Sequence, residues 1–192
     1  MYSIAQIRED SKQLRELSER IGETFRTRDR GPEQRARWEA ACSDFHNRFD
    51  KLYYPGGDVE LAKVRAGDVG GIESAILFLT ADPWHFRSGY IKEYLWRVVT
   101  RCPLSTADKE RLQSAALSYL DRQIGREFWY MCRAMTRIGS GKFWAKVAQT
   151  AETATPFVAK RASYLLAFSH GIHEGAKVQK QVYRDVLREK YG

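Results

Sequence analysis

The fold is decided by residues 3–54, SIAQIREDSKQLRELSERIGETFRTRDRGPEQRARWEAACSDFHNRFDKLYY. In the first part of this stretch, apolar side chains recur near heptad spacing, at Ile4, Ile7, Leu14, Leu17, Ile21 and Phe25. Ser11 and Ser18 fill the weak positions of the same stripe. Residues three or four apart share one face of a helix, so this spacing predicts a single long helix with an apolar stripe.

A second stripe follows the breaker Gly31-Pro32, and proline suits the first turn of a helix because its missing N–H would be unpaired there. Its members lie 4, 3, 4 and 3 residues apart, at Trp38, Cys42, Phe45, Phe49 and Leu52. Two helices joined by a short turn can bury both stripes only by folding back on each other. We therefore expect an antiparallel helical hairpin over residues 3–54, ended by Tyr54-Pro55-Gly56-Gly57.

The rest of the chain has the pattern of shorter helices. Asp58, Asp68, Ser105 and Thr155-Pro156 are candidate starts, and Asp82-Pro83 is another, with Ser88 as a competing start for the same helix. No hairpin turn or period-two run indicates a strand. The sequence predicts an all-α protein with a hairpin domain at 1–57 and a body at 58–192. Its stacked antiparallel helix pairs would be like HEAT or TPR solenoids in architecture only, because no repeated motif is present.

The composition is that of an ordinary soluble globular protein: 43% of the 192 residues are hydrophobic and 29% are charged. This balance excludes a disordered or collagen-like chain. The 3 cysteines form neither a C-x-x-C pair nor a dense framework, which indicates reduced thiols. No apolar run is long enough to span a bilayer, and residues 1–10 have no signal-peptide core. We expect a cytoplasmic protein without a membrane partner.

Little in the sequence indicates chemistry. The only close histidine pair, His170 and His173, lacks the further ligands that a zinc site needs. Nucleotide-loop, nucleophile-elbow and metalloprotease motifs are missing, and Gly139-Ser-Gly-Lys142 fits a tight turn between helices better than a phosphate loop. We therefore predict no catalytic residue, no metal and no cofactor.

Positive charge gathers in the C-terminal half. Of 32 Lys and Arg and 24 Asp and Glu in the chain, residues 101–192 hold 16 and 8, so the net charge of +8 resides there. Lys and Arg recur at helical spacing in two rows. The first contains Arg126, Arg133, Arg137, Lys142 and Lys146, with Tyr130 on the same face, and the second contains Lys177, Lys180, Arg184 and Arg188. Such rows can bind a polyanion, and Tyr130 could stack on a base. The alternative is an ordinary solvated face.

Two pairs of aromatic residues are candidate partner-binding groups. Phe25 and Trp38 fall at the tip of the expected hairpin, where a protruding apolar group would be exposed unless another chain covers it. Trp84 and Phe86 fall in the segment after Asp82-Pro83, where a loop tryptophan can anchor a partner. For the first pair, the alternative is a hairpin that lies flat along the body. For the second pair, the alternative is burial between the hairpin and the body.

Three classes of function follow from these patterns. The favoured hypothesis is a non-enzymatic helical scaffold, of the adaptor, immunity or antitoxin kind, that binds another protein or forms a homodimer. The alternative is a nucleic-acid-binding protein that uses the basic C-terminal half. An enzyme of unrecognised type is the third.

Overall fold

The computed structural model describes residues 2–171 and residue 188, and within these residues the backbone is helical with no strand. The elements are α1 (Ile4–Phe25), η1 (Arg28–Arg30), α2 (Pro32–Leu52), α3 (Gly57–Ala66), α4 (Val69–Ala81), α5 (Ser88–Val99), α6 (Thr106–Tyr119), α7 (Phe128–Ile138), α8 (Gly141–Thr153) and α9 (Pro156–Ser169). They form two compact units, residues 1–104 and 105–192. The all-α prediction is confirmed.

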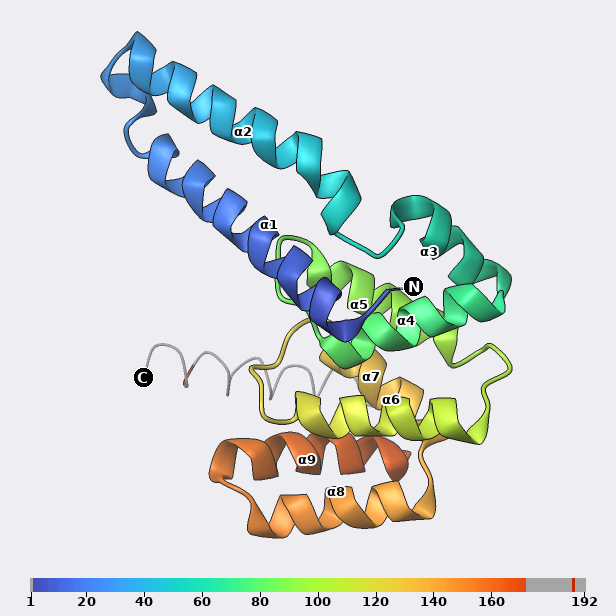
Figure 1. Cartoon of the computed structure of the whole chain (residues 1–192). Coiled ribbons are helices and arrows are strands. Elements are labelled where there is room, and N and C mark those ends of the chain that lie inside the picture. Colours follow the sequence, from blue (N-terminus) through green and yellow to red (C-terminus); the bar gives the residue numbers. More distant parts are fainter. Residues whose placement is uncertain (1, 172–187, 189–192) are drawn as a thin grey trace. The chain divides into compact units, whose positions relative to one another are not determined.

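Helices α1 and α2 form the expected antiparallel hairpin (Figure 1). Ser3 caps α1 by accepting a hydrogen bond from the Gln6 N–H at 3.1 Å, and Pro32 occupies the first turn of α2. The seam buries side chains of the two predicted stripes, among them Leu14 and Phe45. Apolar periodicity was therefore sufficient to locate both helices.

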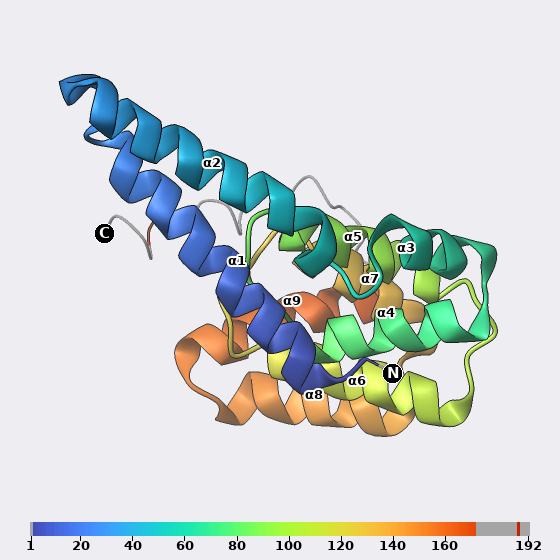
Figure 2. The same cartoon turned by 45° about the horizontal axis from the view of Figure 1, so that its top comes forward.

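Helices α3, α4 and α5 complete the N-terminal unit by packing near the open end of the hairpin. Helix α4 is the most apolar of them and contacts α1, α3 and α5, so it lies at the centre of the unit. The rings of Tyr54 and Phe78 pack within this core, 5.0 Å apart between centroids and tilted by 47°, and the Tyr54 hydroxyl pairs with Ser74 Oγ at 2.8 Å. The tip of the hairpin extends away from α3–α5 (Figure 2).

Two of the predicted helix starts are wrong. Gly56, in the left-handed region at φ 74°, is the N-cap of α3, and Asp58 instead accepts a hydrogen bond from the Tyr53 hydroxyl at 2.5 Å. Asp82 ends α4 as its C-cap, and α5 begins at Ser88, the competing start. Because Asp82 adopts φ 47°, the chain leaves α4 as a loop rather than entering a helix at Pro83.

The C-terminal unit consists of α6 to α9 in its described part. Helix α6 begins with the predicted capping box, in which Ser105 Oγ accepts from the Asp108 N–H and Asp108 accepts from the Ser105 N–H, each at 3.1 Å. Helices α8 and α9 run antiparallel side by side. Gly139 and Ser140 form the expected tight turn, with Ser140 capping α8.

The division between the units lies after Leu104. The boundary predicted from the sequence was after residue 57. The reason is packing: α4 contacts α1, and α3 contacts α2, so the helices of residues 57–99 belong with the hairpin. Among the described helices, none combines the length and the apolarity that crossing a bilayer requires.

Candidate protein-docking site

The loop between α4 and α5 is the most unusual feature of the N-terminal unit. We call residues 82–87, DPWHFR, the aromatic loop. Its two ends, Asp82 at φ 47° and Arg87 at φ 67°, are the only non-glycine residues of the described chain with positive φ. Such backbone is uncommon outside glycine and persists where the surroundings hold it in place. Contacts with α1 and α5 hold the backbone of the aromatic loop in this conformation.

Helix α1 holds the loop through one serine. Ser11, which is buried, donates its hydroxyl to the Trp84 carbonyl and accepts from the Trp84 N–H, both at 3.0 Å. Arg8 Nε adds a bond to the Ala81 carbonyl at 3.2 Å. A small polar residue in the apolar stripe of α1 thus satisfies both backbone groups of Trp84 and fixes the loop to the hairpin.

Helix α5 holds the other side of the loop. The Lys92 ammonium lies 2.7 Å from Asp82 Oδ1, with both side chains largely buried. Ser88 Oγ accepts from the His85 N–H at 3.1 Å, and His85 Nδ1 lies 2.9 Å from the Phe86 carbonyl. Buried polar groups that find partners in this way define one conformation, so the loop is a rigid element of the unit.

His85 is neutral in this setting. Burial, the largest influence, lowers its pKa from 6.5 to about 4, and the nearby Lys92 and Arg15 charges act in the same direction. Because a carbonyl oxygen can only accept, Nδ1 carries the hydrogen that binds the Phe86 carbonyl. The hydrogen bond from the neutral His85 ring therefore holds the Phe86 carbonyl in one orientation.

This burial predicts a loss of stability in acid. An unfolded His85 takes up a proton below pH 6.5, whereas the folded one resists protonation down to about pH 4. The free energy of unfolding should therefore fall as pH drops through this window, by about 3 kcal/mol from this residue at its lower end. Urea unfolding at pH 7 and pH 4 measures it, with His85→Asn as the control that keeps a donor near the Nδ1 position. If wild type and His85→Asn lost the same free energy of unfolding between pH 7 and pH 4, the loss could not be assigned to His85.

The rigid loop presents large aromatic groups to solvent. Trp84 is 68% exposed, Phe86 is 53% exposed and the nearby Tyr90 of α5 is 60% exposed. Phe86 packs one side on Phe45 and Phe49 of α2, each 6.0 Å away between ring centroids. Exposed aromatic groups on a fixed backbone are typical of an interaction surface.

Two hollows adjoin the aromatic loop. One, of about 290 Å³, is lined by Arg15, Ser18, Glu19, Trp84, His85 and Phe86. The other, of about 340 Å³, is lined by Phe49, Asp50, Tyr53, Asp58, Leu61, Arg87, Tyr90, Ile91 and Tyr94. Arg15 also places its guanidinium carbon 5.8 Å from the Trp84 ring centroid. The surface around the loop is thus concave on both sides and carries charge beside its aromatic rings.

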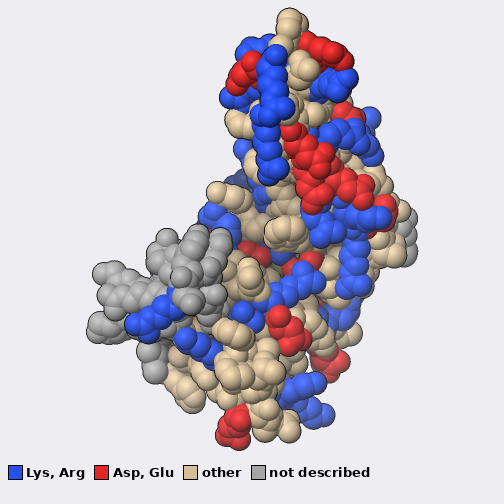
Figure 3. All heavy atoms as spheres, turned by 90° about the vertical axis from the view of Figure 1, so that its left-hand side faces the viewer, with Lys and Arg blue, Asp and Glu red and all other residues tan. Residues whose placement is uncertain are grey.

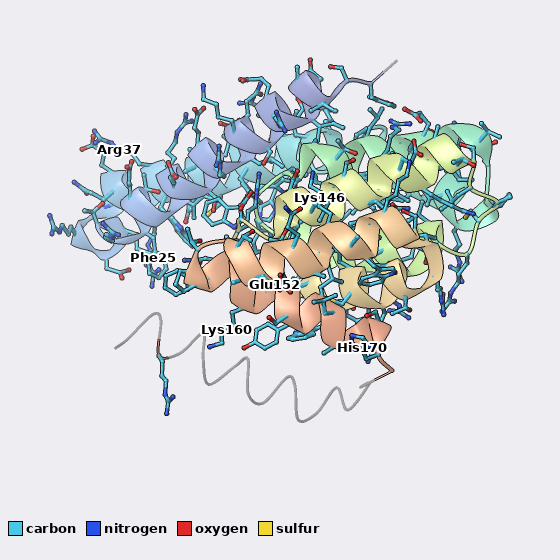
Figure 4. All side chains as sticks on the ribbon, turned by 90° about the horizontal axis from the view of Figure 1, so that it is seen from below. Phe25, Arg37, Lys146, Glu152, Lys160 and His170 are labelled. Atoms are coloured by element: carbon cyan, nitrogen blue, oxygen red, sulfur yellow. The ribbon has the colours of Figure 1, made fainter. Side chains whose placement is uncertain are left out.

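The hairpin tip forms a separate cluster. Phe25 is 50% exposed and meets Trp38 edge-on at 6.3 Å, while the Arg28 guanidinium lies 3.5 Å from the Phe25 ring centroid. Figure 4 shows Phe25 and Arg37 at this far end of the hairpin. About 21 Å of helix separates Phe25 from Ser11, so the four predicted partner-binding aromatics form two sites. The role of Phe25 and Trp38 in an interface stays a prediction.

The predicted basic row is exposed in its described part. Arg126, Arg133 and Arg137 are exposed on or beside α7, and Lys142 and Lys146 are exposed on α8. Tyr130 is half-buried, with the Arg133 guanidinium 5.9 Å from its ring centroid. Of the second row, Arg188 is exposed, and Lys177, Lys180 and Arg184 lie outside the described residues.

Ion pairing distinguishes the hairpin from four cations of α7 and α8. On the hairpin, cations and carboxylates are interspersed (Figure 3) and form pairs such as Arg20–Asp44 at 3.2 Å and Arg37–Glu33 at 2.6 Å. Arg133, Arg137, Lys142 and Lys146 make no ion pair with another residue of the described chain. Within the described residues, no carboxylate lies at ion-pairing distance from these four cations.

Comparisons with known proteins add no functional information. No protein-family model, curated protein or solved structure matches the chain. Within residues 2–171 and 188, no group of three or more His, Cys, Asp and Glu side chains is placed to hold a metal ion. Function is therefore inferred from the aromatic loop, the hairpin tip and the basic row.

Sequence reasoning identified Trp84 and Phe86 but missed the residues that position them. Ser11 had a detectable signal, because a serine inside an apolar stripe needs a hydrogen-bond partner once it is buried. No sequence signal marked His85 or Lys92, because a lone histidine and a helical lysine are ordinary surface residues in most sequences.

Proposed function

We propose that this protein is a non-enzymatic helical scaffold that binds another protein through the aromatic loop. The observation that carries the proposal is the combination of exposed Trp84 and Phe86 side chains with a backbone held by Ser11, His85 and the Asp82–Lys92 pair. Holding two aromatic rings in one orientation lowers the entropy lost when a partner binds them. Aromatic side chains at the centre of an interface contribute most of its binding energy.

Replacing both exposed rings, as Trp84→Ser and Phe86→Ser, should abolish partner binding with little loss of stability. Quantitative affinity purification from the native host, with wild type and double variant as baits, measures this effect; a bound partner should fall at least about tenfold, because each anchor contributes 1–2 kcal/mol or more. Phe157→Ser is the matched control, since Phe157 of α9 is also 53% exposed. Equal recovery of every protein by all three baits would contradict the proposal.

A second candidate function is the binding of a polyanion such as nucleic acid by the C-terminal unit. The specific observation in its favour is the set of exposed cations Arg133, Arg137, Lys142 and Lys146 on α7 and α8, which form no ion pair within the described part of the chain. Cations without local carboxylates remain available to phosphate groups, and binding of this kind releases counterions and weakens with salt.

Charge reversal tests this candidate. The triple variant Arg133→Glu, Arg137→Glu and Lys146→Glu should lose salt-sensitive retention on heparin and on duplex DNA, because three phosphate contacts become repulsive. The control reverses three exposed cations of the N-terminal unit, Arg26, Arg65 and Arg101, and so makes the same change in net charge. Retention that falls equally in both variants would reduce the effect to net charge alone and contradict a specific basic face.

A further inference from the structure

Four aromatic rings contribute to the walls of the larger hollow beside the aromatic loop. Phe49 of α2 and Tyr53, its C-cap, provide one side, and Tyr90 and Tyr94, one turn apart on α5, provide another. Phe49 and Tyr53 stack nearly parallel, 5.2 Å apart with 14° between their planes. The face of an aromatic ring carries negative electrostatic potential and attracts cations. A hollow lined by four aromatic rings therefore suits a positively charged group that meets an accessible ring face.

Two carboxylates reinforce this preference. Asp50 and Asp58 line the hollow together with the rings, and Asp58 Oδ1 accepts the Tyr53 hydroxyl at 2.5 Å. Burial raises the pKa of Tyr53, and the Asp58 hydrogen bond and the charges of Asp58 and Asp50 raise it further. The contributions of Asp58 and Asp50 indicate a negative electrostatic potential at the Tyr53 phenol. A negative potential attracts cations.

Among the described residues, the single cation that lines the hollow is Arg87, at the junction with the aromatic loop. Its guanidinium carbon is 5.3 Å from the centroid of Phe86, and its side chain is exposed. One cation against two carboxylates leaves the hollow with a net negative charge. At about 340 Å³, its volume is at the low end of ligand sites and suits one amino-acid side chain.

We propose that this hollow receives a lysine or arginine side chain of the partner protein, with Phe49, Tyr53, Tyr90 and Tyr94 around the cation and Asp50 and Asp58 neutralising it. The inference rests on the proposed docking function and adds the chemistry of the bound segment. A chain that covers Phe86 lies next to Arg87 and Tyr90, so it can reach the hollow without leaving the docking surface. The partner segment thus combines an apolar residue for Trp84 and Phe86 with a nearby cation.

The test uses small probes, so it does not depend on finding the partner. The wild-type protein with ¹³C-labelled tyrosine is titrated to high millimolar concentration with N-acetylarginine amide and N-acetyllysine amide. N-acetylnorleucine amide, which has a similar length and no charge, is the control probe. We expect saturable shifts of the Tyr53, Tyr90 and Tyr94 ring signals with the two cations and at least about fivefold weaker binding of norleucine.

A second comparison uses Asp50→Asn together with Asp58→Asn. The amide oxygen of asparagine can still accept the Tyr53 hydroxyl, so the walls are retained while the charge is removed. Binding of the cationic probes should weaken about fivefold in this variant. Equal binding of the cations and norleucine, or no shift with the cations, or full affinity in the variant, would overturn the inference. None of these results would affect partner recovery through Trp84 and Phe86, so the two proposals fail separately.

Discussion

Phe45→Asp should cost at least about 4 kcal/mol of the free energy of unfolding, because it places a carboxylate in the apolar seam of the hairpin. Phe45 is buried, stacks on Phe49 at 5.4 Å and meets Phe86 at 6.0 Å between ring centroids. The change therefore removes support from the hairpin and from the aromatic loop at once. Thermal melting followed by circular dichroism measures the loss.

Asn47→Asp is the matched control for this prediction. Asn47 lies two residues further along α2 and is exposed, so its new carboxylate stays in water and should change stability by less than about 0.5 kcal/mol. If the Phe45→Asp and Asn47→Asp proteins melt together with wild type, the seam does not exist as described.

Asp82→Asn should destabilise the N-terminal unit by about 3 kcal/mol, because it removes a carboxylate that faces the buried Lys92 ammonium at 2.7 Å. Asparagine tolerates the left-handed backbone that Asp82 adopts at φ 47°, so the change isolates the charge. The double variant Asp82→Asn/Lys92→Met should recover much of the loss, since no buried ammonium remains. Urea unfolding of wild type, the single variants Asp82→Asn and Lys92→Met, and the double variant gives the coupling free energy.

A surface ion pair of similar length provides the control. Arg37 and Glu33 lie 2.6 Å apart with about 70% of each side chain exposed, and Glu33→Gln should cost less than about 0.5 kcal/mol. Equal effects of Asp82→Asn and Glu33→Gln would mean that the pair does not hold the aromatic loop.

The hairpin could be predicted from sequence because it depends on local periodicity. The stripes around Leu14 and Phe45 repeat every three or four residues, and such a repeat has one efficient solution, burial against a partner helix. The capping box at Ser105 and the cap at Asp68 were equally local. Asp82-Pro83 failed because the same residues can end one helix and start another, and the Lys92 partner that decides between them lies ten residues away.

The candidate site was only half predictable for a similar reason. Trp84 stands out in a sequence as a large aromatic residue near a proline, whereas the contacts of Ser11 with its backbone span 73 residues of sequence. The aromatic hollow combines α2, α3 and α5, and no short motif links Tyr53, Asp58 and Tyr90. Tertiary packing brings such residues together, and a single sequence does not show which distant residues come into contact.

The most direct test of docking through the aromatic loop is site-specific photo-crosslinking in cells of the native host. Benzoylphenylalanine at position 84 keeps an aromatic group on the loop, and the same residue at position 157 is the exposed control. We predict discrete adducts of higher mass from position 84, lost when Phe86 is also replaced by Ser, and no matching adducts from position 157. The absence of adducts at position 84, or the same adducts from both positions, would contradict the proposal.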